Sequence, residues 1–138
     1  AERLGVDAIA AIPPIYFRET SSRPFASNDR VELWETYITQ VNRSLLGIHL
    51  DYRLTWGRFP LDCAAVRMPC IATPHFYTQK ILFPDLCVLY QDVDRAAYLV
   101  KKLLKDRVFY DHVMSYAESK LPYFAESETK ERLLELLS

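Results

Sequence analysis

Short apolar runs alternate along this chain with segments in which apolar residues recur every three to four positions. Each apolar run is nearly continuous, which is typical of strands that are buried on both faces of a parallel sheet. Proline, glycine or clustered polar residues bound these runs and favour strands over helices there. The pattern predicts about four strands, at residues 7–12, 45–50, 69–73 and 86–90.

The segments with a helical period predict the helices. Asp92 and Asp106 precede two of them, where an aspartate side chain can accept hydrogen bonds from the first helical N–H groups. Residues 77–81 are expected to add one helical turn. The predicted helices lie at about residues 31–41, 58–66, 93–104, 107–121 and 126–137.

The order of these elements predicts the fold class. Strands that alternate with helices indicate an α/β fold, here a Rossmann-like parallel sheet of about four strands with helices on both faces, in a single domain over residues 1–138. Residues 16–28 show no sustained period and predict a long loop, with residues 27–29 capping the next helix. Ligands of such sheets bind at the carboxyl ends of the strands. The loops expected there follow Ile12, Leu50 and Thr73.

Charge and composition narrow the classes of partner. Seventeen basic and eighteen acidic residues give a net charge of −1, which offers no overall attraction to nucleic acid or to an anionic membrane. No run approaches the roughly 20 apolar residues that span a bilayer, so we expect membrane association only through parts outside this sequence. The chain begins at Ala1, in what resembles the end of a helix, and we expect it to be a fragment of a longer, two-domain protein.

The three cysteines, Cys63, Cys70 and Cys87, lie in apolar surroundings. We interpret them as buried free thiols, which favour a reducing compartment and a cytoplasmic location. Their spacing relative to His75 matches no zinc-binding pattern, so no metal is expected.

The chemistry of the chain concentrates in residues 52–65, which predict a glycine loop followed by the start of a helix. Free backbone N–H groups and the helix dipole favour phosphate groups at such a place. Arg53 and Arg58 flank Gly57 and are candidates for pairing with a diphosphate. The alternative interpretation is a pair of surface arginines in ion pairs. Thr55 is a candidate for capping the helix or for contacting a phosphate.

Residues 61–69, Leu-Asp-Cys-Ala-Ala-Val-Arg-Met-Pro, resemble the nucleotide-sugar-binding segment of the retaining GT-B glycosyltransferases, group 1 or family 4-like. The family pattern is Glu-x7-Glu-Ala-x-Ala-x-Gly-x-Pro, and Asp62, Ala65 and Pro69 match its second half. Residues 83–110 resemble the closing segment of the same domain.

The resemblance implies the C-terminal, donor-binding half of a GT-B glycosyltransferase. Its substrate would be a nucleotide diphosphate sugar, with no cofactor, and its partner an N-terminal acceptor-binding domain of the same protein. Asp62 would contact the ribose, and the loop and helix start before it would hold the diphosphate. The alternative for Asp62 is an ordinary carboxylate in the first turn of the helix. His75, after the third strand, is a candidate donor contact, with loop packing as its alternative.

The missing first Glu of the family pattern and the apolar tail at residues 130–137 support another function class, and the pattern is departed from at three positions. Leu54 stands at the first Glu, Arg67 replaces the family Gly, and Asp62 is shorter than Glu by one methylene. The alternative is a non-catalytic α/β interaction domain that retains the fold. Residues 1–17 also resemble a segment of the lyase family of TIM barrels that includes N-acetylneuraminate lyase, and we interpret this segment as an ordinary helix-to-strand connection.

Overall fold

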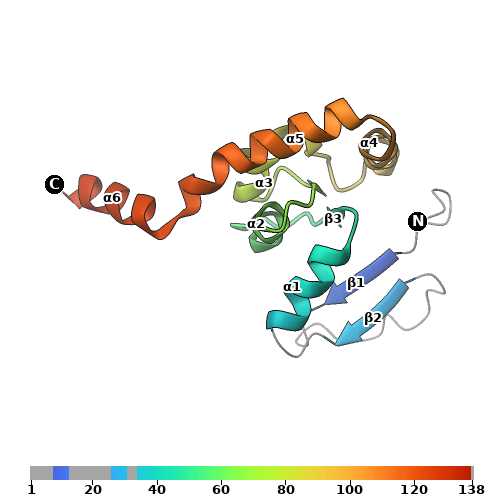
Figure 1. Cartoon of the computed structure of the whole chain (residues 1–138), viewed down its shortest axis with the longest axis horizontal. Coiled ribbons are helices and arrows are strands. Elements are labelled where there is room, and N and C mark those ends of the chain that lie inside the picture. Colours follow the sequence, from blue (N-terminus) through green and yellow to red (C-terminus); the bar gives the residue numbers. More distant parts are fainter. Residues whose placement is uncertain (1–7, 13–25, 31–33, 138) are drawn as a thin grey trace. The chain divides into compact units, whose positions relative to one another are not determined.

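The computed structural model describes residues 8–12, 26–30 and 34–137, which form a mixed α/β structure (Figure 1). The chain divides into two compact units, Ala1–Arg43 and Ser44–Ser138. The single domain expected over residues 1–138 stays a prediction.

The first unit contains a parallel strand pair and a helix. Strand β1 (Ala8–Ile12) pairs in parallel with β2 (Ala26–Arg30), and helix α1 (Trp34–Arg43) follows. β1 and α1 confirm the strand and the helix predicted there. Val31, at the predicted helix start, and most of the expected loop lie outside the described residues.

Strand β2 corrects the sequence prediction for residues 26–30. Ser27, Asn28 and Asp29 pair with residues of β1, so they do not cap a helix. Pairing with β1 satisfies the backbone of a segment whose side chains have little intrinsic preference for strands.

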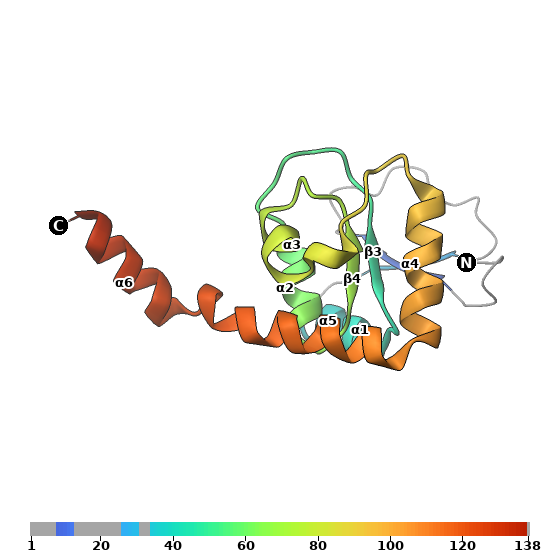
Figure 2. The ribbon, with the colours of Figure 1, turned by 90° about the horizontal axis from the view of Figure 1, so that it is seen from above.

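The second unit is built on two short parallel strands, β3 (Gly47–His49) and β4 (Cys70–Ala72). Helix α2 (Arg58–Ala65) contacts both strands, and α4 (Val93–Lys105) contacts β4. Figure 2 shows the strand pair between α4 on one side and α2 and α3 on the other. The remaining elements are α3 (Tyr77–Leu82), the 3-10 turn η3 (Pro84–Leu86), α5 (Arg107–Lys120), the 3-10 turn η4 (Leu121–Phe124) and α6 (Glu126–Leu137).

Local signals for the helices of this unit are confirmed. Asp92 Oδ1 accepts a hydrogen bond from Arg95 N at 2.9 Å and caps α4. Asp106 Oδ1 accepts one from Phe109 N at 2.9 Å and caps α5. The predicted helical turn near residues 77–81 is α3. The core lies among the strands and helices and includes Cys63, Cys70, Ile71, Phe76, Leu82, Phe83, Leu86 and Leu99.

The predicted fourth strand at residues 86–90 is wrong. Leu86 ends the turn η3, and within residues 86–90 Cys87 alone forms a parallel bridge, with Ala72. One backbone bond, from Val88 N to Ala72 O at 2.9 Å, accompanies this bridge. The described strands therefore form two separate two-stranded parallel sheets, β1–β2 and β3–β4.

The Gln79 side chain satisfies part of the edge of β4 along which the predicted fourth strand does not form. Gln79 is fully buried, and its Nε2 lies 2.9 Å from Cys70 O and 3.3 Å from both Phe83 O and Leu86 O. Carbonyls two residues apart on a strand point the same way, so Cys70 O faces the side on which Ala72 O accepts from Val88. The Gln79 amide thus satisfies a carbonyl that a continuous strand would otherwise bind.

Replacing Gln79 by leucine is expected to destabilise the protein strongly. Gln79→Leu keeps a buried side chain of similar size but removes the Nε2 donor from Cys70 O and Leu86 O, while Phe83 O keeps its bond from Leu86 N at 3.0 Å. An unsatisfied buried polar group costs about 1–3 kcal/mol, so we expect a loss of about 2 kcal/mol or more in the free energy of unfolding. Urea denaturation measures this loss. The control is Gln91→Leu at an exposed glutamine, and equal losses in the two variants would contradict the role of Gln79.

Candidate functional site

The loops that follow β3 and β4 are joined beyond the ends of the strands. Thr55 N donates to His75 O at 3.3 Å, and Thr55 O accepts from Tyr77 N at 3.1 Å. Thr78 N donates to Trp56 O at 3.1 Å, and Thr55 forms a parallel bridge with Phe76. The predicted meeting of the loops after Leu50 and Thr73 is therefore confirmed. The loop after Ile12 lies outside the described residues.

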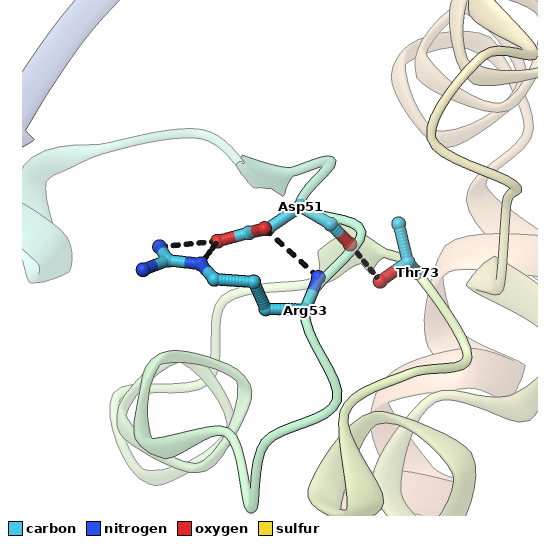
Figure 3. Close-up of polar contacts among 3 residues, drawn as sticks. All are labelled: Asp51, Arg53 and Thr73. Atoms are coloured by element: carbon cyan, nitrogen blue, oxygen red, sulfur yellow. Dashed lines mark hydrogen bonds and ion pairs between the residues drawn. The ribbon is translucent and has the colours of Figure 1, made fainter.

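A second junction between the two loops involves Asp51, Arg53 and Thr73 (Figure 3). The fully buried Thr73 donates its Oγ1 hydrogen to Asp51 O at 2.7 Å. Arg53 Nη2 and Nε lie 2.5 and 2.8 Å from Asp51 Oδ2, and Arg53 N lies 3.0 Å from Oδ1. Both carboxylate oxygens of Asp51 thus accept hydrogen bonds from Arg53. The backbone carbonyl of Asp51 is in turn bonded to Thr73, in the loop after β4.

This geometry affects the ionisation of Asp51. The side-chain hydrogen bond from Arg53 lowers the pKa of the Asp51 carboxyl from 3.8 to about 2, against the opposing effect of partial burial. The ion pair lies at the surface, because the Arg53 side chain is 56% exposed. Sequence analysis missed Asp51, although a carboxylate two residues before a candidate arginine was a usable signal.

Gly57 begins α2 in a conformation that suits glycine. Its φ of 81° lies in the left-handed region, and an added Cβ would stand 2.7 Å from Phe76 Cβ. Thr78 Oγ1 donates to Gly57 O. In the described part of the chain no side chain caps the α2 N-terminus, so the expected capping by Thr55 is wrong. The Thr55 side chain is exposed, and its backbone makes the loop contacts described above.

Arg58 and Asp62 lie one turn apart on α2. Arg58 Nε is 3.7 Å from Asp62 Oδ1, and the two side chains are 70% and 10% exposed. The first turn of α2 holds no acidic residue, so the alternative of Asp62 as a first-turn carboxylate is wrong. The dipole effect fades beyond that turn. Asp62 instead places its carboxylate beside Arg58, the first residue of the helix.

The residues after β4 divide between the surface and the core. His75 is half-buried in the turn, where its carbonyl accepts the Thr55 bond. Gln79, which also follows the strand, is fully buried and donates to backbone carbonyls, so its role is in packing.

His49, at the end of β3, packs against two aromatic rings. The centroid of its ring lies 4.6 Å from that of Phe76 and 5.6 Å from that of Phe59. Burial lowers the pKa of His49, with Asp51 opposing the shift and Arg53 adding to it.

The thiols are poor candidates for chemistry. Burial raises the pKa of Cys63 well above its ordinary value and that of Cys87 to about 11, so neither forms a reactive thiolate near neutral pH. Cys63 and Cys70 are buried free cysteines, as predicted, and Cys87 is half-buried.

Among the described residues no group of His, Cys, Asp or Glu could hold a metal ion. Within the described ranges, no helix has both the length and the hydrophobicity needed to cross a membrane.

No known family model matches the chain, and searches of curated proteins and of solved structures found no match either.

The Asp51–Arg53 pair predicts a pH-dependent contribution to stability. The folded-state pKa of about 2 lies below the ordinary 3.8. The ionised carboxyl therefore contributes stability that is fully present above about pH 4 and is lost as the pH falls through about 2. We expect Asp51→Asn to lower the free energy of unfolding by up to about 1 kcal/mol near neutral pH, because the pair is surface-exposed.

Urea denaturation of both proteins across this pH range measures the effect. The difference between them should shrink steadily between about pH 4 and pH 2. Glu131→Gln, at an exposed glutamate in the middle of α6, controls for the general loss of a carboxylate. A difference for Asp51→Asn that stays constant to the lowest pH would show that the ion pair is not its source.

Proposed function

We propose that the unit Ser44–Ser138 binds the diphosphate of a nucleotide-sugar and is the donor-binding part of a GT-B glycosyltransferase. The observation that supports this proposal most directly is the backbone pairing of the loops that follow β3 and β4. Arg53 and Arg58 lie on either side of Gly57, which ends the first of these loops. The N-terminus of α2 begins there without a side-chain cap, which leaves its dipole and amides as a favourable place for phosphate.

The charges of this edge support modest rather than tight binding. Arg53 is held by Asp51 and Arg58 lies near Asp62, so the two arginines are balanced by two carboxylates. Both arginine side chains are more than half exposed, so an anion can approach them from the solvent. An entering diphosphate would form charge-assisted bonds with these guanidinium groups in addition to bonds from the backbone.

The resemblance to GT-B enzymes supplies the finer parts of the proposal. The unit would be part of a Rossmann-like sheet, with β3, β4 and the Cys87 bridge as its described portion. Asp62 would contact the ribose, and His75, Thr55 and Gly57 would line the donor site. The protein would act in the cytoplasm together with an N-terminal domain that binds the acceptor.

The proposed reaction transfers the sugar from the nucleotide diphosphate to an acceptor hydroxyl. The bond between the sugar and the diphosphate breaks, the acceptor oxygen forms the new bond, and its proton is released. This chain would contribute positioning and stabilisation of the negative charge that develops on the leaving diphosphate. No residue of this chain is assigned to proton transfer.

A non-catalytic interaction domain is the second candidate. The observation that favours it is Leu54, which stands where the family has its first Glu and is 82% exposed. A leucine there provides no hydrogen bond to a donor sugar. The ion pairs of both arginines with neighbouring carboxylates also suit a surface that binds no nucleotide.

Calorimetric titration with UDP, GDP and ADP separates the two candidates. We expect one of them to bind weakly, and we expect Arg53→Ala and Arg58→Ala each to reduce that affinity about tenfold, the typical value of one hydrogen bond to a charged group. Arg107→Ala is the matched control, since Arg107 also begins a helix and pairs with an aspartate four residues on.

Two results would contradict the donor-binding function. One is a folded protein that binds none of the three nucleotides up to millimolar concentration. The other is a nucleotide affinity that Arg53→Ala and Arg58→Ala change no more than Arg107→Ala does, which would favour the interaction domain.

A further inference from the structure

The turn η4 near the C-terminus packs against the loop that precedes α2. The Trp56 and Phe124 rings pack in a T-shaped arrangement, with centroids 5.9 Å apart and planes at 87°. The Tyr123 ring packs edge-on against Phe124 at 5.1 Å, and the Tyr123 and Tyr77 hydroxyl oxygens lie 2.9 Å apart. The turn η4 therefore contacts both the loop before α2 and the start of α3, although Tyr123 follows Tyr77 by 46 residues and Phe124 lies farther still from Trp56 in the sequence.

One arginine of α6 holds this turn in place. Arg132 Nη2 donates to Tyr123 O at 2.7 Å, and its guanidinium carbon lies 3.9 Å from the centre of the Tyr123 ring. A second bond, at 3.3 Å, joins Nη2 to Thr129 Oγ1 within the same helix. A planar guanidinium suits this combination of hydrogen bonding and ring stacking, which a lysine would reproduce only in part.

We propose that Tyr123, Phe124 and Arg132 form a C-terminal strap that positions the loop Thr55–Gly57 and thereby sets its affinity for a diphosphate. The strap holds this loop from outside, through Trp56 and Tyr77. Backbone bonds hold it from inside, since Tyr77 N and Thr78 N donate to the carbonyls of Thr55 and Trp56. These residues are positioning residues and need not touch the ligand.

The geometry of Gly57 fixes the inner side of the loop, while its outer side is open to further contacts. An added Cβ on Gly57 would lie 2.7 Å from Phe76 Cβ and 2.9 Å from Thr78 Oγ1, so the backbone passes very close to the next segment. The Trp56 side chain, by contrast, is 54% exposed and is not enclosed by the core. The aromatic contact with Phe124 adds a fixed point on this exposed side of the loop.

The strap can be tested without any ligand. In a Trp34→Phe background, Trp56 is the sole tryptophan of the chain and its emission reports on the contact with Phe124. We expect Phe124→Leu and Arg132→Gln to shift this emission and to speed hydrogen exchange at the Tyr77 and Thr78 amides. Lys130→Gln, an exposed position on the same helix with the same change of charge, is the matched control and should change neither.

Nucleotide titration of the same variants tests the effect on affinity, which rests on the proposed function. An aromatic contact of this kind corresponds to roughly a three- to tenfold change in an equilibrium constant, and we expect both variants to weaken nucleotide diphosphate binding by that factor. Urea denaturation should show that they stay folded under the conditions of the titration.

The outcomes separate the strap from the proposed function. Unchanged emission and exchange in Phe124→Leu and Arg132→Gln would overturn the strap. Changed emission and exchange with unchanged nucleotide affinity would overturn its effect on binding and leave the donor-binding function intact. A wild-type chain that binds none of UDP, GDP and ADP would overturn both the donor-binding function and the effect on affinity, while exchange would still decide whether the strap holds the loop.

Discussion

The backbone pairing between the loop at residues 55–57 and the segment at residues 75–78 is the constraint on which the candidate site depends. β3 and β4 are each three residues long, too short to align distant side chains by themselves. The bonds beyond their ends continue the parallel alignment around Thr55 and Trp56 up to the start of α2. Because these bonds use backbone atoms, they fix the path of the loop while leaving its exposed side chains available for other contacts.

The charges at this edge are arranged as local pairs. Asp51 holds Arg53, and Asp62 lies beside Arg58, so the edge combines exposed guanidinium groups with little net charge. Such pairs keep the arginines oriented when no ligand is present, which reduces the ordering that binding would otherwise require. They also compete with an incoming anion. Under the donor-binding proposal, recognition of a diphosphate would therefore rest on the fork of N–H donors that each planar guanidinium presents to phosphate oxygens, more than on net positive charge.

Local patterns in the sequence predicted what local physics determines. The caps Asp92 and Asp106, the helix from Arg58 and the strand near residues 70–72 all follow from hydrogen-bonding chemistry or hydrophobic period within a few residues. The errors arise where distant partners decide the outcome. β2 forms because β1 pairs with it, and residues 86–90 lose their strand although their apolar pattern is strong.

The candidate site shows the same division between local and distant effects. The sequence alone indicated that the two arginines, Gly57 and Asp62 lie around the start of one helix, because glycine and charged residues cluster there. It could not reveal that Thr73 would fix the Asp51 carbonyl, or that Phe124 would meet Trp56 from the other end of the unit. These contacts join residues that are 22 positions apart or more, and no periodicity carries that information.

The surroundings of Leu54 show whether folding requires a leucine where the glycosyltransferase pattern has its first glutamate. Its side chain is 82% exposed, and the pairing of the loop is carried by the backbone of the next residue, Thr55. A glutamate at this position would meet water and would disturb no buried contact, so the fold does not require a leucine there. Under the donor-binding proposal, the leucine would alter the contact with the sugar and would leave the groups proposed to hold the diphosphate unchanged, so its effect would fall on binding of the sugar and not on folding.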